Sequence, residues 1–207
     1  MREEAGFEPF HYVSRETIDR FRLLESMVRK WNPAINLVSK DSVDQLRERH
    51  IRDSVQLFGI VDFAQGAWCD LGSGGGFPGL VIAILMQGTS RERHVKLVES
   101  DGRKAAFLRE AVRQLELEAV VINARVEAIP ALGASVLSAR ALAGLPKLCE
   151  FALRHLLPSG VALFPKGVSY KSEVLEARKN WEFDLSLHMS KTDPTAAILE
   201  LRNIRHV

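Results

Sequence analysis

The sequence predicts an α/β fold in which helices cover both faces of a mainly parallel sheet. From residue 66 onward, short apolar runs alternate with helix-like stretches, as in folds built from right-handed crossovers. A glycine-dense loop at 70–79 separates the first apolar run from a helix-like one. The chain closes with two strand-like runs, 181–189 and 196–204, joined by a polar turn. These runs predict an antiparallel hairpin at the end of the sheet.

Residues 1–60 are predicted to form a helical extension that packs on a domain formed by 61–207, so that the two make one compact unit. Ser14 is suited to cap a helix over 15–31, because apolar residues follow it at helical spacing. Pro33 is expected to end that helix, since proline lacks the N–H that helix propagation needs.

A second helix is expected to begin near Asp41 and to continue through Phe58. On it, His50, Asp53 and Ser54 fall at positions i, i+3 and i+4, so they share one face. A nucleophilic Ser/His/Asp set is one interpretation. Side chains one turn apart on a single helix rarely meet the geometry of such a triad, so a hydrogen-bonded structural cluster is favoured.

The alternating region is expected to contain five parallel strands with helices between them. The strands are predicted at 66–71, 94–99, 119–124, 135–139 and 160–165. The helices include 80–86, 103–115 and 145–157, and Pro78 suits the first turn of the first of them.

The loop at 70–79 reads Asp-Leu-Gly-Ser-Gly-Gly-Gly-Phe-Pro-Gly. A dinucleotide fingerprint would require glycine where Phe77 stands, and no Gly-Lys-Ser/Thr follows as a P-loop would require. Asp70, directly before the first glycine, suits a ligand that carries an ammonium or sulfonium group. The loop therefore predicts a cradle for a nucleotide-type cofactor, with a tight turn that binds no ligand as the alternative.

Ligands of open α/β sheets lie beyond the carboxyl ends of the strands. The second strand ends in Glu99, whose carboxylate can accept hydrogen bonds from both ribose hydroxyls; the alternative is an acid that favours a helix N-terminus. The third strand leads into 125–127, where backbone groups can meet an adenine ring. Arg140 and Lys166 follow the fourth and fifth strands, where they would face a second substrate.

Composition is that of an ordinary globular protein, with 46% hydrophobic and 26% charged residues. The formal net charge of +2 gives only a weak nucleic-acid signal, although basic residues cluster within 91–113 and 138–172. Cys69 and Cys149 lie in apolar segments and suggest core positions rather than a metal site, so no metal is expected. Neither a signal peptide nor a transmembrane stretch is evident, which predicts a cytoplasmic protein without membrane contact.

Together these features resemble the class I S-adenosylmethionine-dependent methyltransferases, whose core is a Rossmann-like sheet. More specifically, the chain resembles the glucose-inhibited division protein B family, the bacterial 16S rRNA guanine-N7 methyltransferases. The blocks that carry the resemblance occur in the family's order between about residues 20 and 170. They are Lys-Trp-Asn-Pro-Ala-Ile-Asn-Leu at 30–37, Arg-His-Ile-Arg-Asp-Ser at 49–54, the loop at 70–79, Lys-Ala-Ala-Phe-Leu at 104–108, Arg-Val-Glu at 125–127, Ser-Ala-Arg-Ala at 138–141 and Lys-Gly at 166–167.

The resemblance implies S-adenosylmethionine as cofactor, S-adenosylhomocysteine as product and 16S rRNA as substrate, within a small-subunit ribonucleoprotein particle. The sequence leaves the oligomeric state open, with a monomer favoured. The resemblance implies that Arg140 lies at the junction of cofactor and substrate. We expect Arg140 to position the substrate without a general base, and Arg125, Arg140 and Lys166 to contact RNA, with surface salt bridges as the alternative for each cation. Glu99 stands where many relatives have Asp, and the loop is richer in glycine than theirs. The expected cofactor-binding residues are Asp70, Ser73 and Gly74 of the loop and, as the resemblance implies, Gly72, Phe77, Glu99, Val126, Glu127 and Arg140.

The sequence lacks the motif of amine methylation and a suitably placed cysteine nucleophile, and methylation of guanine N7 requires neither. N7 carries an in-plane lone pair and no proton, so its methylation needs alignment and electrostatics rather than a base. The Asp/Asn-Pro-Pro-aromatic motif of amine methylation is replaced by Ser-Ala-Arg-Ala at 138–141, and Cys149 lies mid-helix rather than where a cytosine-attacking nucleophile stands. Because the N7 edge of duplex RNA faces a narrow groove, the target base should be unpaired or unstacked. A small-molecule or protein methyltransferase and a non-catalytic assembly factor remain alternatives.

Overall fold

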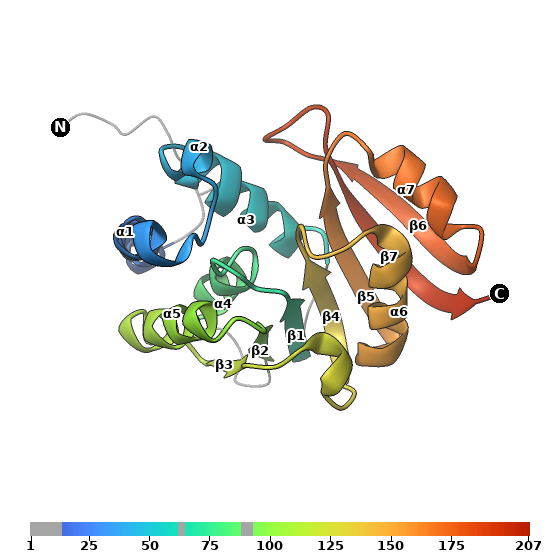
Figure 1. Cartoon of the computed structure of the whole chain (residues 1–207), viewed down its shortest axis with the longest axis horizontal. Coiled ribbons are helices and arrows are strands. Elements are labelled where there is room, and N and C mark those ends of the chain that lie inside the picture. The colour runs from blue at the N-terminus through green and yellow to red at the C-terminus, as the bar shows by residue number, and fades with distance from the viewer. Residues whose placement is uncertain (1–13, 62–64, 88–92) are drawn as a thin grey trace.

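A seven-stranded sheet forms the centre of the protein in the computed structural model, which describes residues 14–61, 65–87 and 93–207. The strand order is β3-β2-β1-β4-β5-β7-β6, so the order reverses between β1 and β4 (Figure 1). The strands are β1 (Gly66–Leu71), β2 (Arg93–Val98), β3 (Ala119–Ile122), β4 (Ala134–Ala139), β5 (Leu156–Lys166), β6 (Trp181–Met189) and β7 (Ala197–His206).

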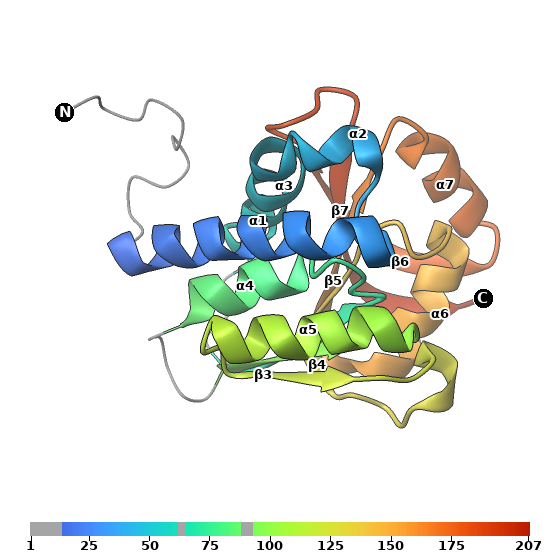
Figure 2. The same ribbon diagram turned by 60° about the vertical axis from the view of Figure 1, so that its left-hand side comes forward.

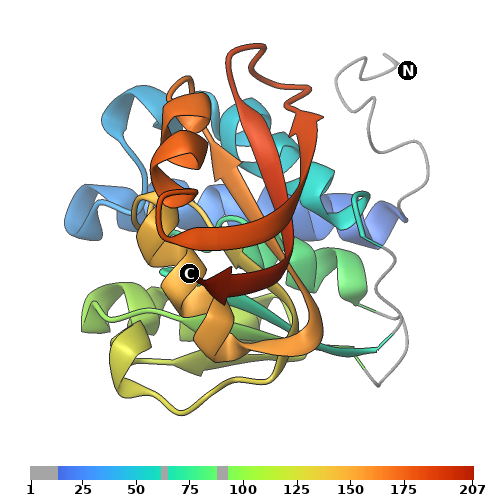
Figure 3. The same ribbon diagram turned by 90° about the vertical axis from the view of Figure 1, so that its right-hand side faces the viewer.

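The pairing confirms the predicted sheet. Strands β1 to β5 pair in parallel, and β7 pairs antiparallel with both β5 and β6. Figure 3 brings this C-terminal hairpin toward the viewer. Strand β5 is longer than predicted, because it begins directly after the preceding helix at Leu156 rather than near residue 160.

Helices cover both faces of this sheet. Helices α4 and α5 pack on one face with α1 lying over both, and α6 and α7 lie on the other (Figures 1 and 2). Helix α7 had no counterpart in the sequence prediction. The helices are α1 (Arg15–Ile35), α2 (Lys40–Val43), the π-helical turn η2 (Arg47–Arg52), α3 (Asp53–Phe58), α4 (Gly79–Met86), α5 (Gly102–Gln114), the 3₁₀ turn η3 (Val126–Ala128), α6 (Leu145–His155) and α7 (Tyr170–Ala177).

Helix α1 is longer than predicted. Its start agrees, because the Ser14 hydroxyl accepts a hydrogen bond from the Thr17 N–H at 3.2 Å. Pro33 does not end the helix. It removes only one N–H donor, and the helix instead ends at Asn36, which adopts a left-handed conformation with φ of 51°.

The predicted second helix is broken into three pieces, α2, η2 and α3. Hydroxyl hydrogen bonds lie at the start of the first piece, which ends at Val43: Ser39 donates to Ser42 at 3.0 Å and Ser42 donates to the Ser39 carbonyl at 2.9 Å. Such bonds compete with the helical ladder. The π-helical turn then carries His50 and leads without a gap into α3.

Two apolar clusters hold the layers together, one on each face of the sheet. Helix α4 is apolar on every side because it lies between the sheet and helices α1, α3 and α5. Phe21 and Leu24 of α1 are fully buried in the same cluster as Ile82 of α4 and Phe107 of α5. The N-terminal helices therefore share an apolar cluster with the helices of the sheet domain.

Candidate functional site

Three cavities open at the carboxyl ends of the parallel strands, around the point where the strand order reverses. One of about 460 Å³ lies over the glycine-rich loop, and one of about 190 Å³ lies beside it; both are lined by Gly72. We call these the loop cavity and the small cavity. A third of about 550 Å³, which we call the acceptor cavity, shares Arg140 with the loop cavity and Leu142 with the small cavity.

The glycine-rich loop is shaped by local hydrogen bonds. The Ser73 hydroxyl donates to the Asp70 carbonyl at 2.9 Å, and the Gly76 N–H donates to the Ser73 carbonyl at 2.7 Å. Gly72 has φ of 64°, and a Cβ there would lie 2.6 Å from Leu142 Cδ1. Glycine is therefore needed at 72 both for the turn and for the close approach of the chain to the cavity walls.

Asp70 lies beneath this loop, almost wholly buried. Its Oδ1 accepts from the Ser138 hydroxyl at 2.7 Å, and its Oδ2 accepts from the Gly79 N–H at 3.1 Å, at the start of α4. Burial raises the pKa of the carboxyl to about 6. Among the described residues it lines none of the three cavities, so its geometry fits an anchor of the loop and of α4, and its contact with a cationic ligand stays a prediction.

Glu99 ties the glycine-rich loop to α5. Its Oε2 accepts from the Gly74 N–H at 2.8 Å and its Oε1 accepts from the Asp101 N–H at 2.7 Å. Each carboxylate oxygen keeps a further lone pair, so ribose hydroxyls can still donate to it. The residues on either side, Val98 and Ser100, line the small cavity.

The small cavity contains the segment that the sequence predicts at an adenine. Arg125, Val126 and Glu127 line it from one side, and Phe151 of α6 lines it from another. Val126 is buried, whereas Arg125 and Glu127 are exposed. An apolar slot with polar groups at its rim suits a flat heterocycle.

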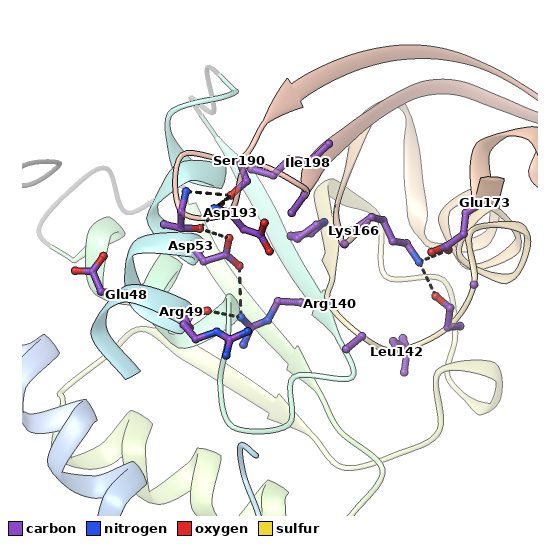
Figure 4. Close-up of a pocket in the computed structure, with 18 residues that line it drawn as sticks. Glu48, Arg49, Asp53, Arg140, Leu142, Lys166, Glu173, Ser190, Asp193 and Ile198 are labelled. Atoms are coloured by element: carbon purple, nitrogen blue, oxygen red, sulfur yellow. Dashed lines mark hydrogen bonds and ion pairs between the residues drawn. The ribbon is translucent and has the colours of Figure 1, made fainter. Parts of the chain in front are cut away.

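Arg140 lies where the loop cavity and the acceptor cavity meet. Its Nη2 donates to His50 Nδ1 at 2.8 Å, and its Nη1 lies 3.2 Å from the Arg49 carbonyl and 3.4 Å from Asp53 Oδ2 (Figure 4). Its guanidinium carbon is also 5.6 Å from the centre of the Phe77 ring. The N-terminal helical segment and the loop thus orient a residue that follows β4.

His50 is neutral in this cluster. Burial, with the charges of Arg140 and Arg49, lowers its pKa to about 3. Its Nδ1 therefore accepts the hydrogen bond from Arg140, and its ring stacks on Phe77 with the ring centres 5.0 Å apart. The Ser54 hydroxyl donates to the His50 carbonyl at 2.5 Å, not to the ring, so these residues do not form a nucleophilic triad.

Lys166 lines the acceptor cavity but is already engaged. Its Nζ donates to Glu173 Oε2 at 2.7 Å and to the Ala143 carbonyl at 2.8 Å, and the same Glu173 oxygen accepts from the Leu145 N–H. One of the three ammonium donors remains for a ligand. Glu173 escaped the sequence reasoning because α7, which carries it, was not predicted.

The other candidates from the sequence lie outside the site. Cys149 is buried in α6, and burial raises the pKa of its thiol to about 12, which does not suit a nucleophile. Within the described ranges, no three His, Cys, Asp or Glu residues are grouped to hold a metal ion. In the same ranges, no helix is long and apolar enough to cross a membrane.

Relatives of this chain match most of its length. It is 51% identical over 195 residues to the ribosomal RNA small subunit methyltransferase G of Paracoccus denitrificans, covering 94% of this chain and 98% of that one. It is 48% identical to a protein of the same name from Cereibacter sphaeroides, covering 94% and 95% of the two chains.

A solved structure shows the same fold. A SAM dependent methyltransferase from Aquifex aeolicus aligns with a TM-score of 0.60 and 12% identity, covering 86% of this chain and 97% of that one. The family model described as GidB, rRNA small subunit methyltransferase G, matches residues 17–197. On this match and on the identity to its relatives, the chain belongs to the rRNA small subunit methyltransferase G family.

Proposed function

We propose that this protein transfers a methyl group from S-adenosylmethionine to N7 of a guanine in 16S rRNA. The observation that carries the proposal is the position of Arg140, which lines both the loop cavity and the acceptor cavity in a chain of the rRNA methyltransferase family. A residue that faces both cavities can align an acceptor base with a methyl donor.

The cavities fit such a cofactor. Gly72 opens the approach between the loop cavity and the small cavity, Glu99 holds acceptor oxygens for a ribose, and Val126 and Glu127 border a slot for adenine. Ser73, Gly74 and Phe77 line the loop cavity, where the amino-acid part would lie. When bound, S-adenosylmethionine supplies an electrophilic methyl group on a sulfonium.

The described residues around Arg140 offer no ready general base, and N7 methylation requires none. His50 Nδ1 accepts from Arg140, and the Asp53 carboxylate faces Arg140 on one side and Thr192 on the other. The N7 lone pair must point at the methyl group, so Arg140 acts on another acceptor of the nucleotide, the guanine O6 or a phosphate oxygen. Its guanidinium donors match either one.

The position of the acceptor cavity indicates whether the target base is stacked or unpaired in the RNA that binds. A guanine must leave its stack to reach a cavity at the edge of a sheet, which favours an unpaired base. In this proposal, exposed Arg125 and the remaining donor of Lys166 contact the RNA backbone around it. We infer that the substrate is a cytoplasmic small-subunit ribonucleoprotein particle and that the protein acts as a monomer.

Methyl transfer from tritiated cofactor tests the proposal. Purified protein is incubated with bare 16S rRNA, with small ribosomal subunits from a strain that lacks the gene, and with a metabolite extract. We expect label in the rRNA of at least one ribosomal substrate. Label in the extract alone would indicate a small-molecule methyltransferase, and cofactor binding without any transfer would indicate an assembly factor; either result contradicts the proposal.

A further inference from the structure

The turn between β6 and β7 forms one wall of the acceptor cavity, opposite the strand ends. Ser190, Thr192 and Asp193 line the cavity together with Arg140 and Lys166 (Figure 4). This wall comes from the C-terminal hairpin, far in sequence from the N-terminal helices that it meets. The acceptor cavity is therefore complete only when the hairpin turn is held in place.

Gln56 of α3 fastens this turn. Its side-chain oxygen accepts from the Lys191 N–H at 2.6 Å, and its side-chain nitrogen lies 3.3 Å from Thr192 Oγ1 and 3.4 Å from Ser190 Oγ. One amide thus contacts three consecutive residues of the turn. The turn is joined to the helical segment that carries His50 and Asp53.

Asp53 connects the turn to Arg140. Its Oδ1 accepts from the Thr192 hydroxyl at 3.1 Å, while its Oδ2 faces Arg140 Nη1 at 3.4 Å. Both charged side chains are about one-fifth exposed, at 19% for Asp53 and 20% for Arg140. The Thr192 hydroxyl therefore helps to orient the Asp53 carboxylate so that its Oδ2 faces the Arg140 guanidinium.

We propose that Thr192 is a positioning residue for the acceptor site, acting through Asp53 on Arg140. The inference rests on the proposed function, because it gives Arg140 its role at the acceptor nucleotide. The terminal torsion of an aspartate is broad, so when the Thr192 hydroxyl is lost the carboxylate turns about its remaining contact to the Gln56 side-chain nitrogen at 3.3 Å. Arg140 keeps its hydrogen bonds to the Arg49 carbonyl and to His50, so the change at Asp53 shifts its guanidinium between the two cavities rather than releasing it.

Small displacements at such a junction have large effects on transfer rates, because alignment supplies much of the acceleration. In the proposed function the cofactor contacts are made by other residues, namely those of the glycine-rich loop and the segment at 126–127, which line the cavities, and Glu99, which holds the loop. Loss of the Thr192 hydroxyl should therefore lower the turnover rate and leave cofactor binding unchanged. If Thr192 had only a structural role, its loss would lower the turnover rate, the cofactor affinity and the folding stability together.

The test compares Thr192→Val, which removes the hydroxyl at nearly constant shape, with Thr192→Ser, which keeps it. The matched control is Thr17→Val on α1, the same change at a residue that lines none of the three cavities. The measurements are kcat at saturating rRNA, the cofactor Kd by calorimetry, and the Tm. A fourth readout needs neither cofactor nor RNA: the ¹⁵N resonance of His50 Nδ1, which accepts from Arg140.

We expect Thr192→Val to lower kcat about tenfold or more, with a cofactor Kd within about twofold of the parent, and Thr192→Ser to restore kcat. The His50 resonance should shift in Thr192→Val alone. An unchanged kcat, no recovery with serine, or a parallel fall of kcat, affinity and Tm overturns the proposal. If the parent protein transfers no methyl group to rRNA, the proposed function is wrong. The positioning role of Thr192 is then tested by the His50 resonance alone, and an unchanged resonance in Thr192→Val overturns that role.

Discussion

Arg140 follows β4, but its hydrogen-bond and ion-pair partners come from the N-terminal helical segment. The sequence predicts that this residue faces a second substrate, because strand ends of a parallel sheet gather at one edge. It does not reveal that Arg49, His50 and Asp53 hold the guanidinium. Those contacts join residues separated by about 90 positions, which no local pattern encodes.

Glu99 holds the glycine-rich loop, and in the proposed function its carboxylate also accepts hydrogen bonds from the cofactor ribose. Glu99→Gln keeps one side-chain oxygen as an acceptor and removes the charge, whereas Glu99→Ala removes both oxygens. We expect Glu99→Ala to weaken cofactor binding by roughly 1.5–3 kcal/mol, because ribose hydroxyls lose a charged acceptor, and Glu99→Gln to weaken it less. Calorimetric Kd values and Tm values of both variants measure this. An unchanged cofactor Kd in Glu99→Ala would remove Glu99 from the cofactor site.

The neutral His50 predicts a pH dependence of stability. Its pKa is about 3 in the folded protein against 6.5 for the ordinary side chain, so the unfolded state gains a proton first as the pH falls. The contribution of His50 to the free energy of unfolding is therefore fully present above pH 6.5. It decreases between pH 6.5 and about pH 3, by at most about 1.4 kcal/mol per pH unit. Urea titrations of the parent and of His50→Asn should show a free-energy difference that shrinks between pH 7.5 and 5. A difference that does not change with pH would contradict the assignment.

At the scale of elements, apolar spacing and the helix caps predicted most of the fold. The parallel strands and helices α4, α5 and α6 carry strong apolar patterns, and their predicted ranges agree with the structure to within a few residues except at the start of β5. The prediction of one continuous helix from Asp41 to Phe58 was wrong, because a turn after Val43 and a π-helical turn at Arg47–Arg52 divide the segment. Helix α7 was missed because few of its residues are buried, so its pattern is weak.

Two helices of the sheet domain begin with glycine, and only one of these positions is tightly enclosed. A Cβ at Gly79 would lie 2.3 Å from Leu97 Cδ2 and 2.7 Å from Asp70 Oδ2, whereas the nearest such atom at Gly102 is 3.7 Å away. We expect Gly79→Ala to lower the free energy of unfolding by about 1–3 kcal/mol, because it overpacks a buried site. Gly102→Ala, the matched control, should be near neutral or stabilising in urea titrations. Equal effects of the two substitutions would contradict this packing.

At the scale of the whole molecule, the proposed acceptor site needs three parts of the chain: the N-terminal helices, the strand ends and the C-terminal hairpin. Thr192 and Asp53 are 139 positions apart, yet their side chains are in contact. Sequence reasoning therefore identified the residues that follow the strands but could not identify the hairpin turn as a wall of the cavity. The contact depends on how the completed sheet carries β7 back toward α3.

The shared core predicts how the chain unfolds. Phe21 of α1 and Ile82 of α4 belong to one apolar cluster, so the N-terminal helices cannot separate without exposing buried surface of the sheet domain. We expect a single calorimetric transition, with circular dichroism and tryptophan fluorescence changing together. Two resolved transitions would show that residues 1–60 and 61–207 are separate folding units.

The atom and the base that receive the methyl group test the central claim most directly. Small-subunit RNA is methylated with a deuterated-methyl cofactor, digested to nucleosides and analysed by mass spectrometry, with the parent protein and with Arg140→Ala. We predict label in 7-methylguanosine alone with the parent, and loss of nearly all of it with Arg140→Ala although cofactor binding persists. Label in another methylated nucleoside, or near-normal labelling by Arg140→Ala, would contradict the account.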